Sequence, residues 1–213
     1  MQKYWLNREG NERLLLFVLG WASDHHAAEH IRPAGYDILC TYDYRGIEPL
    51  TETAPYKEVA LFAWSFGVWA AEHIFSQAAS RENITKAIAL CGTPYPVSDR
   101  YGIPLKSLIV TLEGMRRAGT DRFNKRTYGG YYETIRPYLD DRSTEEKIEE
   151  LAFLIEAAQK EYSPEINWDK AIIGSQDVIF PMANVKAYWD EKGKILDIPH
   201  YPFADPAIVT DNL

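Results

Sequence analysis

The sequence has few of the residues that would point to a disulfide framework, a membrane span or a nucleic-acid surface. It has two cysteines, and its longest apolar run, residues 14–19, is far shorter than the roughly 18 to 20 residues of a membrane span. Acidic residues outnumber cations by 31 to 23, and the net charge of -8 argues against the basic face that phosphate binding requires. The first residues lack the apolar segment of a signal peptide. We therefore expect a cytoplasmic protein that binds neither membranes nor nucleic acid.

The two cysteines do not suggest chemistry. Cys40 and Cys91 each end an apolar run, so we expect both to pack as small hydrophobic side chains inside a sheet. Neither has a C-x-x-C partner, and the chain has no spaced set of histidines and cysteines of the metal-binding kind. A cysteine nucleophile is the alternative, but neither residue lies in a turn suited to that role. We expect no metal and no cofactor.

Short apolar runs alternate with helix-like segments along the chain. Because these runs are nearly continuous rather than alternating, they are typical of parallel strands covered by helices on both faces. With 213 residues and 46% apolar composition, the chain predicts one α/β domain over residues 1–213, with its site at the carboxyl ends of the strands. The runs are residues 14–20, 37–42, 58–64, 86–91, 170–174 and 194–198.

No strand candidate interrupts residues 97–167, and we interpret this stretch as a helical lid insertion. A serine at 143 followed by acidic residues predicts a helix start. Residues 128–132 combine tyrosines with two glycines, and they either line an acyl pocket or fill the core of the lid; for any single tyrosine we favour core filling. The expected helix carries on one face the apolar residues Ile148, Leu151, Ala152, Leu154 and Ile155.

Ser65 lies between a strand-like run and a helix-like segment, in the sequence A-W-S-F-G. A strand, a serine and then a helix predict a nucleophile elbow, in which small residues two positions away let strand and helix approach each other. Gly67 meets that demand, and Ala63 stands where the usual pattern has glycine. The alternative is a serine that merely caps the following helix.

A serine nucleophile needs an imidazole base, which in turn needs an acid to orient it. His200 follows the last predicted strand, and Asp177 follows the strand before it, so the chain order is Ser, Asp, His as in α/β-hydrolases. The alternatives are a structural histidine and an acceptor in an Asx turn. The other histidines, which lack this placement, are His25, His26, His30 and His73.

The tetrahedral intermediate also needs two backbone amides aimed at its oxyanion. Phe66, directly after the serine, is one candidate donor. Trp21, in the loop after the first strong strand, is the other, with Ala22 behind it. Trp21 could equally serve only as an aromatic wall of the pocket.

Six segments together resemble the BioG-type pimeloyl-carrier-protein methyl ester esterases, which are small α/β-hydrolases of the biotin pathway. The resemblance covers nearly the whole chain. It implies an α/β-hydrolase fold, Ser65 as nucleophile, Asp177 as acid, His200 as base, and Trp21 and Phe66 beside the oxyanion. The segments are L-G-W-A at 19–22, D-Y-R at 43–45, A-W-S-F-G-V-W at 63–69, G-T-P-Y-P at 92–96, G-S-Q-D at 174–177 and P-H-Y-P-F at 199–203.

The implied reaction releases methanol from a pimeloyl methyl ester carried by an acyl carrier protein. Carrier proteins are acidic, so a basic docking surface is expected near the pocket despite the overall negative charge. The alternative for these cations is a solvated helix face. The candidates for docking are Arg116, Arg117, Arg122, Lys125 and Arg126.

Other functions would use the same residues. A general hydrolase of small esters or thioesters needs the same triad, and an acyltransferase shares the acyl-enzyme. A hydrolase-like scaffold that binds a ligand or protein without turnover is the alternative outside enzymes. The oligomeric state has no sequence signal.

Overall fold

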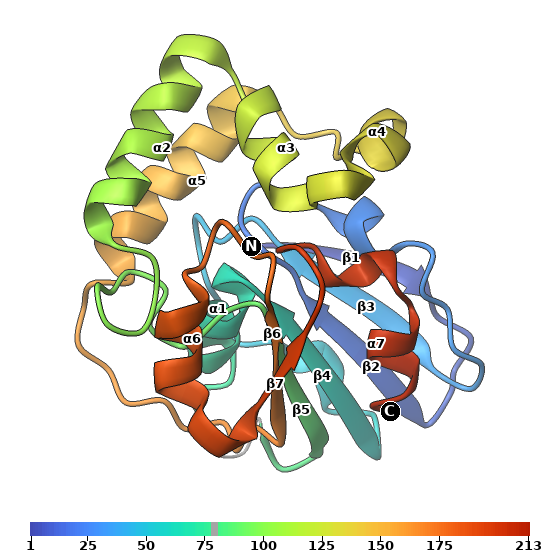
Figure 1. The fold of residues 1–213 in the computed structure, drawn as a ribbon. Helices are drawn as coiled ribbons and strands as arrows, with labels where there is room; N and C mark the ends of the chain where they lie inside the picture. Colours follow the sequence, from blue (N-terminus) through green and yellow to red (C-terminus); the bar gives the residue numbers. More distant parts are fainter. Residues whose placement is uncertain (78–80) are drawn as a thin grey trace.

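The computed structural model describes residues 1–77 and 81–213 and contains a seven-stranded sheet of order β1-β3-β2-β4-β5-β6-β7 (Figure 1). Strands β2 to β7 run parallel, and β1 pairs antiparallel with β3 at one edge. The predicted α/β architecture with a mostly parallel sheet is confirmed. The strands are β1 Gln2–Asn7, β2 Arg13–Val18, β3 Asp37–Tyr42, β4 Glu58–Trp64, β5 Ile84–Leu90, β6 Lys170–Gly174 and β7 Gly193–Leu196.

The one strand that the apolar runs do not predict is β1. Its residues alternate between exposed and partly buried positions, and only Leu6 among them is buried. Because β1 lies at one edge of the sheet and keeps part of its surface toward solvent, its sequence lacks a continuous apolar run.

Helices cover both faces of the sheet. Helices α1 and α6 contribute to the core on one face, and the short helices η1 (His25–Ala28) and α7 contribute to the core on the other. Every helix within the described residues is too short or too polar to cross a membrane. The α-helices are α1 Phe66–Ile74, α2 Leu105–Ala118, α3 Asp121–Tyr128, α4 Tyr132–Ile135, α5 Thr144–Ala157, α6 Met182–Trp189 and α7 Ala207–Thr210.

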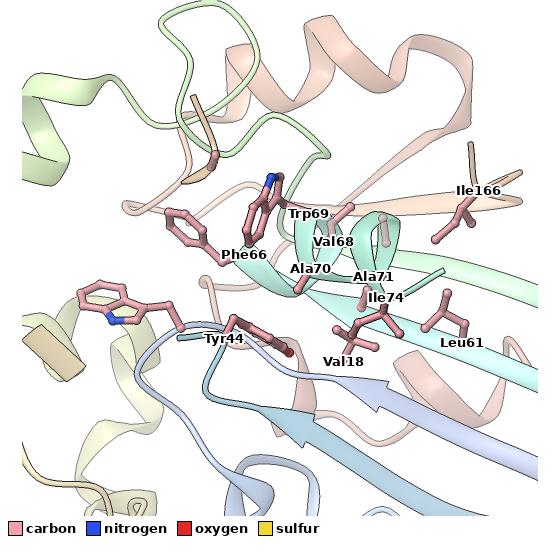
Figure 2. Close-up of a cluster of buried hydrophobic side chains, with 14 of the residues drawn as sticks. Val18, Tyr44, Leu61, Phe66, Val68, Trp69, Ala70, Ala71, Ile74 and Ile166 are labelled. Atoms are coloured by element: carbon pink, nitrogen blue, oxygen red, sulfur yellow. The ribbon is translucent and has the colours of Figure 1, made fainter. Parts of the chain in front are cut away.

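Successive residues of each central strand point into opposite cores. In β2, Leu14 and Leu16 belong to one buried cluster and Leu15 and Phe17 to the other, and none of these side chains is exposed. Figure 2 shows Val18 and Leu61 beside the labelled side chains of helix α1. The continuous apolar runs therefore reflect burial on both sides of the sheet.

Helices α2 to α5, here called the helical insertion, lie between β5 and β6 in the chain. Figure 1 shows α2 and α5 side by side, with α3 and α4 near them beyond one end of the sheet. The helix start predicted at residue 143 is confirmed, because the Ser143 hydroxyl accepts from the Glu146 amide and the Glu146 carboxylate accepts from the Ser143 amide. The division into one domain with a lid over about residues 97–167 stays a prediction.

Left-handed backbone conformations gather just beyond four neighbouring strands. The residues are Ala22 (φ 64°), Asp43 (φ 58°), Ser65 (φ 60°) and Cys91 (φ 46°), which follow β2, β3, β4 and β5. Each is at most 5% exposed. This conformation costs a residue with a side chain roughly 1–2 kcal/mol, so backbone strain is concentrated at the carboxyl ends of the parallel strands.

Candidate active site

Ser65 lies in the tight turn between β4 and α1, with φ 60° and ψ -126°. Close backbone contacts surround it. A Cβ on Gly67 would lie 2.1 Å from the Val18 carbonyl oxygen, and one on Gly92 would lie 2.4 Å from that of Ser65 itself. The Ser65 hydroxyl makes no capping hydrogen bond to helix α1, so the alternative of a serine that only caps the helix is wrong.

The structure brings Ser65, His200 and Asp177 into one hydrogen-bonded chain. His200 Nε2 lies 2.9 Å from Ser65 Oγ, and His200 Nδ1 lies 2.8 Å from Asp177 Oδ2. Because a carboxylate only accepts, Nδ1 carries the proton of a neutral ring and Nε2 is left to accept from the serine hydroxyl. The serine and the histidine are 5% and 2% exposed. This geometry is the arrangement of a nucleophile, a base and an orienting acid.

Asp177 and His200 are each held in place by further contacts. The second oxygen of Asp177, Oδ1, accepts from the amides of Ile179 and Phe180 at 2.7 and 2.9 Å. The Phe180 ring stacks nearly parallel on the His200 ring, with centroids 5.7 Å apart. Trp64 donates from its indole to the His200 carbonyl at 2.8 Å. Sequence reasoning missed Phe180 and Trp64 as supports, although both lie beside residues of the predicted motifs.

Trp21 and Phe66 both line the cavity that contains Ser65 and His200. The Trp21 ring lies 4.5 Å from the Phe123 ring of α3, and its indole donates to the Lys147 carbonyl of α5 at 2.8 Å. The side chain of Trp21 is therefore a wall of the cavity, and donation by its backbone amide to an oxyanion stays a prediction.

The cavity at Ser65 has a volume of about 40 Å³, which holds only a few water molecules. Helices α2 and α3 cover it. Its remaining lining residues are mostly apolar or neutral, with one cation, Arg126, which donates to the Val178 carbonyl at 2.6 Å. The other residues of this lining are Trp64, Ile103, Ser107, Leu108, Thr111, Phe123, Thr127 and Ile179.

A second, mainly apolar cavity of about 450 Å³ lies between the helical insertion, residues 24–30 around helix η1, and the residues after His200. Tyr128 and Tyr131 line it, while Tyr132 is 5% exposed and packs in the core. Tyr128 is likewise 5% exposed and belongs to the same buried cluster as Tyr132, so core filling, the role favoured for a single tyrosine, is observed for both. Lining of an acyl pocket stays a prediction. The cavity contains none of the three hydrogen-bonded residues, so we place the site at the smaller cavity.

The five cations predicted to dock a partner are all exposed, on α2 and α3. Two of them form ion pairs within their own helix: Arg117 with Glu113, and Lys125 with Asp121. Arg116 and Arg122 make no ion pair with any residue that the structure describes. Arg126 lies at the wall of the cavity. Their docking role stays a prediction.

The cysteines and histidines elsewhere do not form a competing reaction centre. Cys40 and Cys91 are buried and free, as predicted, and burial raises the pKa of both thiols, which keeps them protonated. Within residues 1–77 and 81–213, the one group spaced to hold a metal ion is Asp24, His25 and His26. Asp24 is already engaged there, because it accepts from the His26 and Asp141 amides.

Comparison with known proteins gives a family and a fold. The family described as "Pimeloyl-ACP methyl esterase BioG" matches residues 1–207. A protein of Bacteroides fragilis named malonyl-[acyl-carrier protein] O-methyltransferase is 32% identical over 209 residues, which cover 93% of this chain and 41% of that protein. The chain thus spans less than half of this relative.

Two solved structures agree with the fold. BioG from Haemophilus influenzae has a TM-score of 0.87 at 28% identity, and the match covers 96% of this chain and 95% of that one. An esterase from Exiguobacterium antarcticum has a TM-score of 0.65 at 14% identity, covering 93% and 88% of the two chains. The predicted α/β-hydrolase fold is confirmed.

Proposed function

The chain belongs to the pimeloyl-ACP methyl esterase BioG family, and from that membership we propose that it is a serine carboxylesterase. Its substrate is the methyl ester of a pimeloyl group on an acyl carrier protein, in the synthesis of the biotin precursor. The observation that carries the proposal is the hydrogen-bonded chain from Ser65 through His200 to Asp177 at a nucleophile elbow.

The reaction proceeds in two acyl-transfer steps. His200 takes the proton of Ser65 as its oxygen attacks the ester carbonyl, and Asp177 stabilises the imidazolium that forms. The tetrahedral oxyanion accepts from the amides of Trp21 and Phe66. His200 then gives its proton to the methoxy oxygen, methanol leaves, and an acyl ester on Ser65 remains. Water, deprotonated by His200, repeats the attack and releases the carboxylate.

The small cavity is compatible with a small leaving group, because a methoxy group fits beside Ser65 in about 40 Å³. The name of the Bacteroides fragilis relative is also chemically compatible, because O-methylation of a carrier-bound malonyl group makes a carrier-bound methyl ester.

Docking of the acidic carrier is assigned to the exposed cations of α2 and α3. Reversing the charge of Arg116 and Arg122 is the most direct test, because neither substitution breaks an ion pair among the described residues. Lys57 is a matched control: it precedes β4, at the opposite end of the strand from Ser65, and pairs with Glu12 on an exposed surface.

The test is methanol release from the carrier-linked methyl ester and from dimethyl pimelate, with Ser65→Ala as the inactive control. We expect a strong preference for the carrier-linked ester, weakened by salt and by Arg116→Glu with Arg122→Glu but not by Lys57→Glu. Equal turnover of both esters would reduce the function to a general esterase. No turnover together with no fluorophosphonate adduct on Ser65 would favour a non-catalytic scaffold.

A further inference from the structure

One stretch of the helical insertion, residues 141–147, makes hydrogen bonds to the loop that carries Trp21, residues 20–24. Three of its residues contact that stretch. The Trp21 indole donates to the Lys147 carbonyl at 2.8 Å, and Arg142 Nη1 donates to the Ser23 carbonyl at 3.2 Å. The Asp24 carboxylate accepts from the Asp141 amide at 2.9 Å. A segment more than a hundred residues away in sequence therefore fixes this loop in space.

The loop needs such support because it is strained and close to the nucleophile. Ala22 adopts φ 64° although it carries a side chain. A Cβ on Gly20 would lie 3.1 Å from Ser65 Cβ, so the loop runs directly against the serine. Strained conformations persist only where surrounding contacts determine them. A loop released from these contacts would relax and carry the amide of Trp21 away from Ser65.

The supporting stretch is itself fixed by buried charges. The Arg142 side chain is 6% exposed and lies 2.7 Å from Glu150, which is fully buried, and 3.4 Å from Asp43. Lys147 pairs with Asp140 at 2.6 Å, with both side chains at most 5% exposed. Glu150 also accepts from the Tyr44 amide at 2.9 Å. Charges at this depth keep their positions because each needs its partner.

We propose that Asp140, Arg142, Lys147 and Glu150 form a clamp that positions the oxyanion loop, with the bond from the Trp21 indole to the Lys147 carbonyl as its direct link. The inference rests on the proposed function, since it requires the Trp21 amide to donate to the oxyanion. These are positioning residues, because they act through Trp21. The oxyanion exists only in the reaction, so loss of the clamp lowers kcat and leaves KM nearly unchanged.

Trp21→Phe is the cleanest perturbation, because it removes the indole N–H and keeps a ring against Phe123. Trp168→Phe is the matched control. Trp168 is also a buried tryptophan with an indole hydrogen bond, to Glu72 Oε1 at 2.7 Å, but it lines no part of the Ser65 cavity. Arg142→Lys is a second variant, which keeps a cation beside Glu150 but lacks the planar guanidinium whose Nη1 donates to both Glu150 and Ser23 while its Nη2 faces Asp43.

The assay measures kcat and KM for p-nitrophenyl butyrate, with the melting temperature of each variant. We expect kcat to fall about 10-fold in Trp21→Phe and at least 3-fold in Arg142→Lys, with KM within 2-fold of wild type. Trp168→Phe should keep kcat within 2-fold even where its melting temperature falls. A purely structural role would lower melting temperatures without separating Trp21→Phe from Trp168→Phe in kcat.

Two results overturn the clamp while leaving the esterase intact: wild-type kcat in both test variants, or a rise in KM alone, which would make Trp21 only a pocket wall. If the wild type neither hydrolyses the ester nor forms a fluorophosphonate adduct on Ser65, the proposed function fails and the clamp fails with it. The wild-type measurement therefore separates the two failures.

Discussion

Replacing Asp177 by asparagine tests the hydrogen-bonded chain most directly, because the structure dictates how the new side chain must sit. Asp177 Oδ1 accepts from two backbone amides, those of Ile179 and Phe180, whereas Oδ2 has His200 Nδ1 as its one hydrogen-bond partner among the described residues. In Asp177→Asn the carbonyl oxygen must keep the position that accepts from the two amides. The NH₂ group then points at His200 and donates to Nδ1.

The consequence is a change of tautomer. When Nδ1 accepts from the asparagine, the neutral ring carries its proton on Nε2, which then donates to Ser65 Oγ instead of accepting its proton. The general base is lost without any atom moving far. We expect kcat to fall about 10⁴-fold, equivalent to about 5.4 kcal/mol in the barrier, and the melting temperature to change little.

The assay is hydrolysis of a chromogenic ester together with the rate of fluorophosphonate labelling at Ser65. Asp197→Asn is the control, because Asp197 is a nearby exposed carboxylate that accepts from Ser175 and Gln176 and does not contact His200. It should retain nearly full activity. An Asp177→Asn variant that keeps more than about a tenth of wild-type kcat would refute the tautomer argument, and with it the role assigned to Asp177.

Three further predictions concern stability. Gly67→Ala should lower the free energy of unfolding by more than about 3 kcal/mol and abolish activity, because its Cβ would overlap the backbone oxygen of Val18. Denaturant unfolding and ester hydrolysis measure the two effects, and a variant as stable as wild type would contradict the close contact. Burial alone raises the pKa of Asp37, but five hydrogen bonds to its carboxylate outweigh burial and lower it from 3.8 to about 2. Its contribution of about 2 kcal/mol to the free energy of unfolding is thus complete above pH 4 and is lost as the pH falls toward 2. The fall in stability at acid pH should therefore be shallower in Asp37→Asn, as unfolding measured across this pH range will show. Ser143→Ala should cost about 1 kcal/mol by removing the cap from α5, and thermal unfolding measures this loss; a variant as stable as wild type would contradict the cap.

Much of the fold and the core of the site could be predicted from the sequence. Strands β2 to β6 are recognisable because burial on both faces makes most of each strand apolar, whereas the apolar run of β7 is recognisable although this edge strand is partly exposed. The common direction of the strands brings the residues after β4, β6 and β7 to the same end of the sheet. Ser65, Asp177 and His200 meet there for that reason. Their order along the sequence was sufficient to predict that they meet, because parallel strands place the residues that follow them at the same end of the sheet.

The same reasoning from the sequence does not predict the clamp. Helical periodicity predicts the apolar face of α5 with Leu151 and Leu154, which are buried. It gives no reason to bury Lys147 and Glu150 on that helix, because isolated charges favour solvent. Lys147 pairs with Asp140 and Glu150 pairs with Arg142, both of which lie outside the helix, and Glu150 also accepts from the amide of Tyr44, which is distant in sequence. Helical periodicity contains no record of such pairing.

The left-handed residues after β2, β3, β4 and β5 have an evolutionary consequence. Ala22 and Ser65 would each be relaxed by glycine, and Ser65→Gly would relieve strain while removing the proposed nucleophile. Selection for stability alone would therefore oppose these residues, and selection for the proposed turnover would retain them. A descendant of this chain that took up a non-enzymatic role should lose its serine early and gain thermal robustness as it does so.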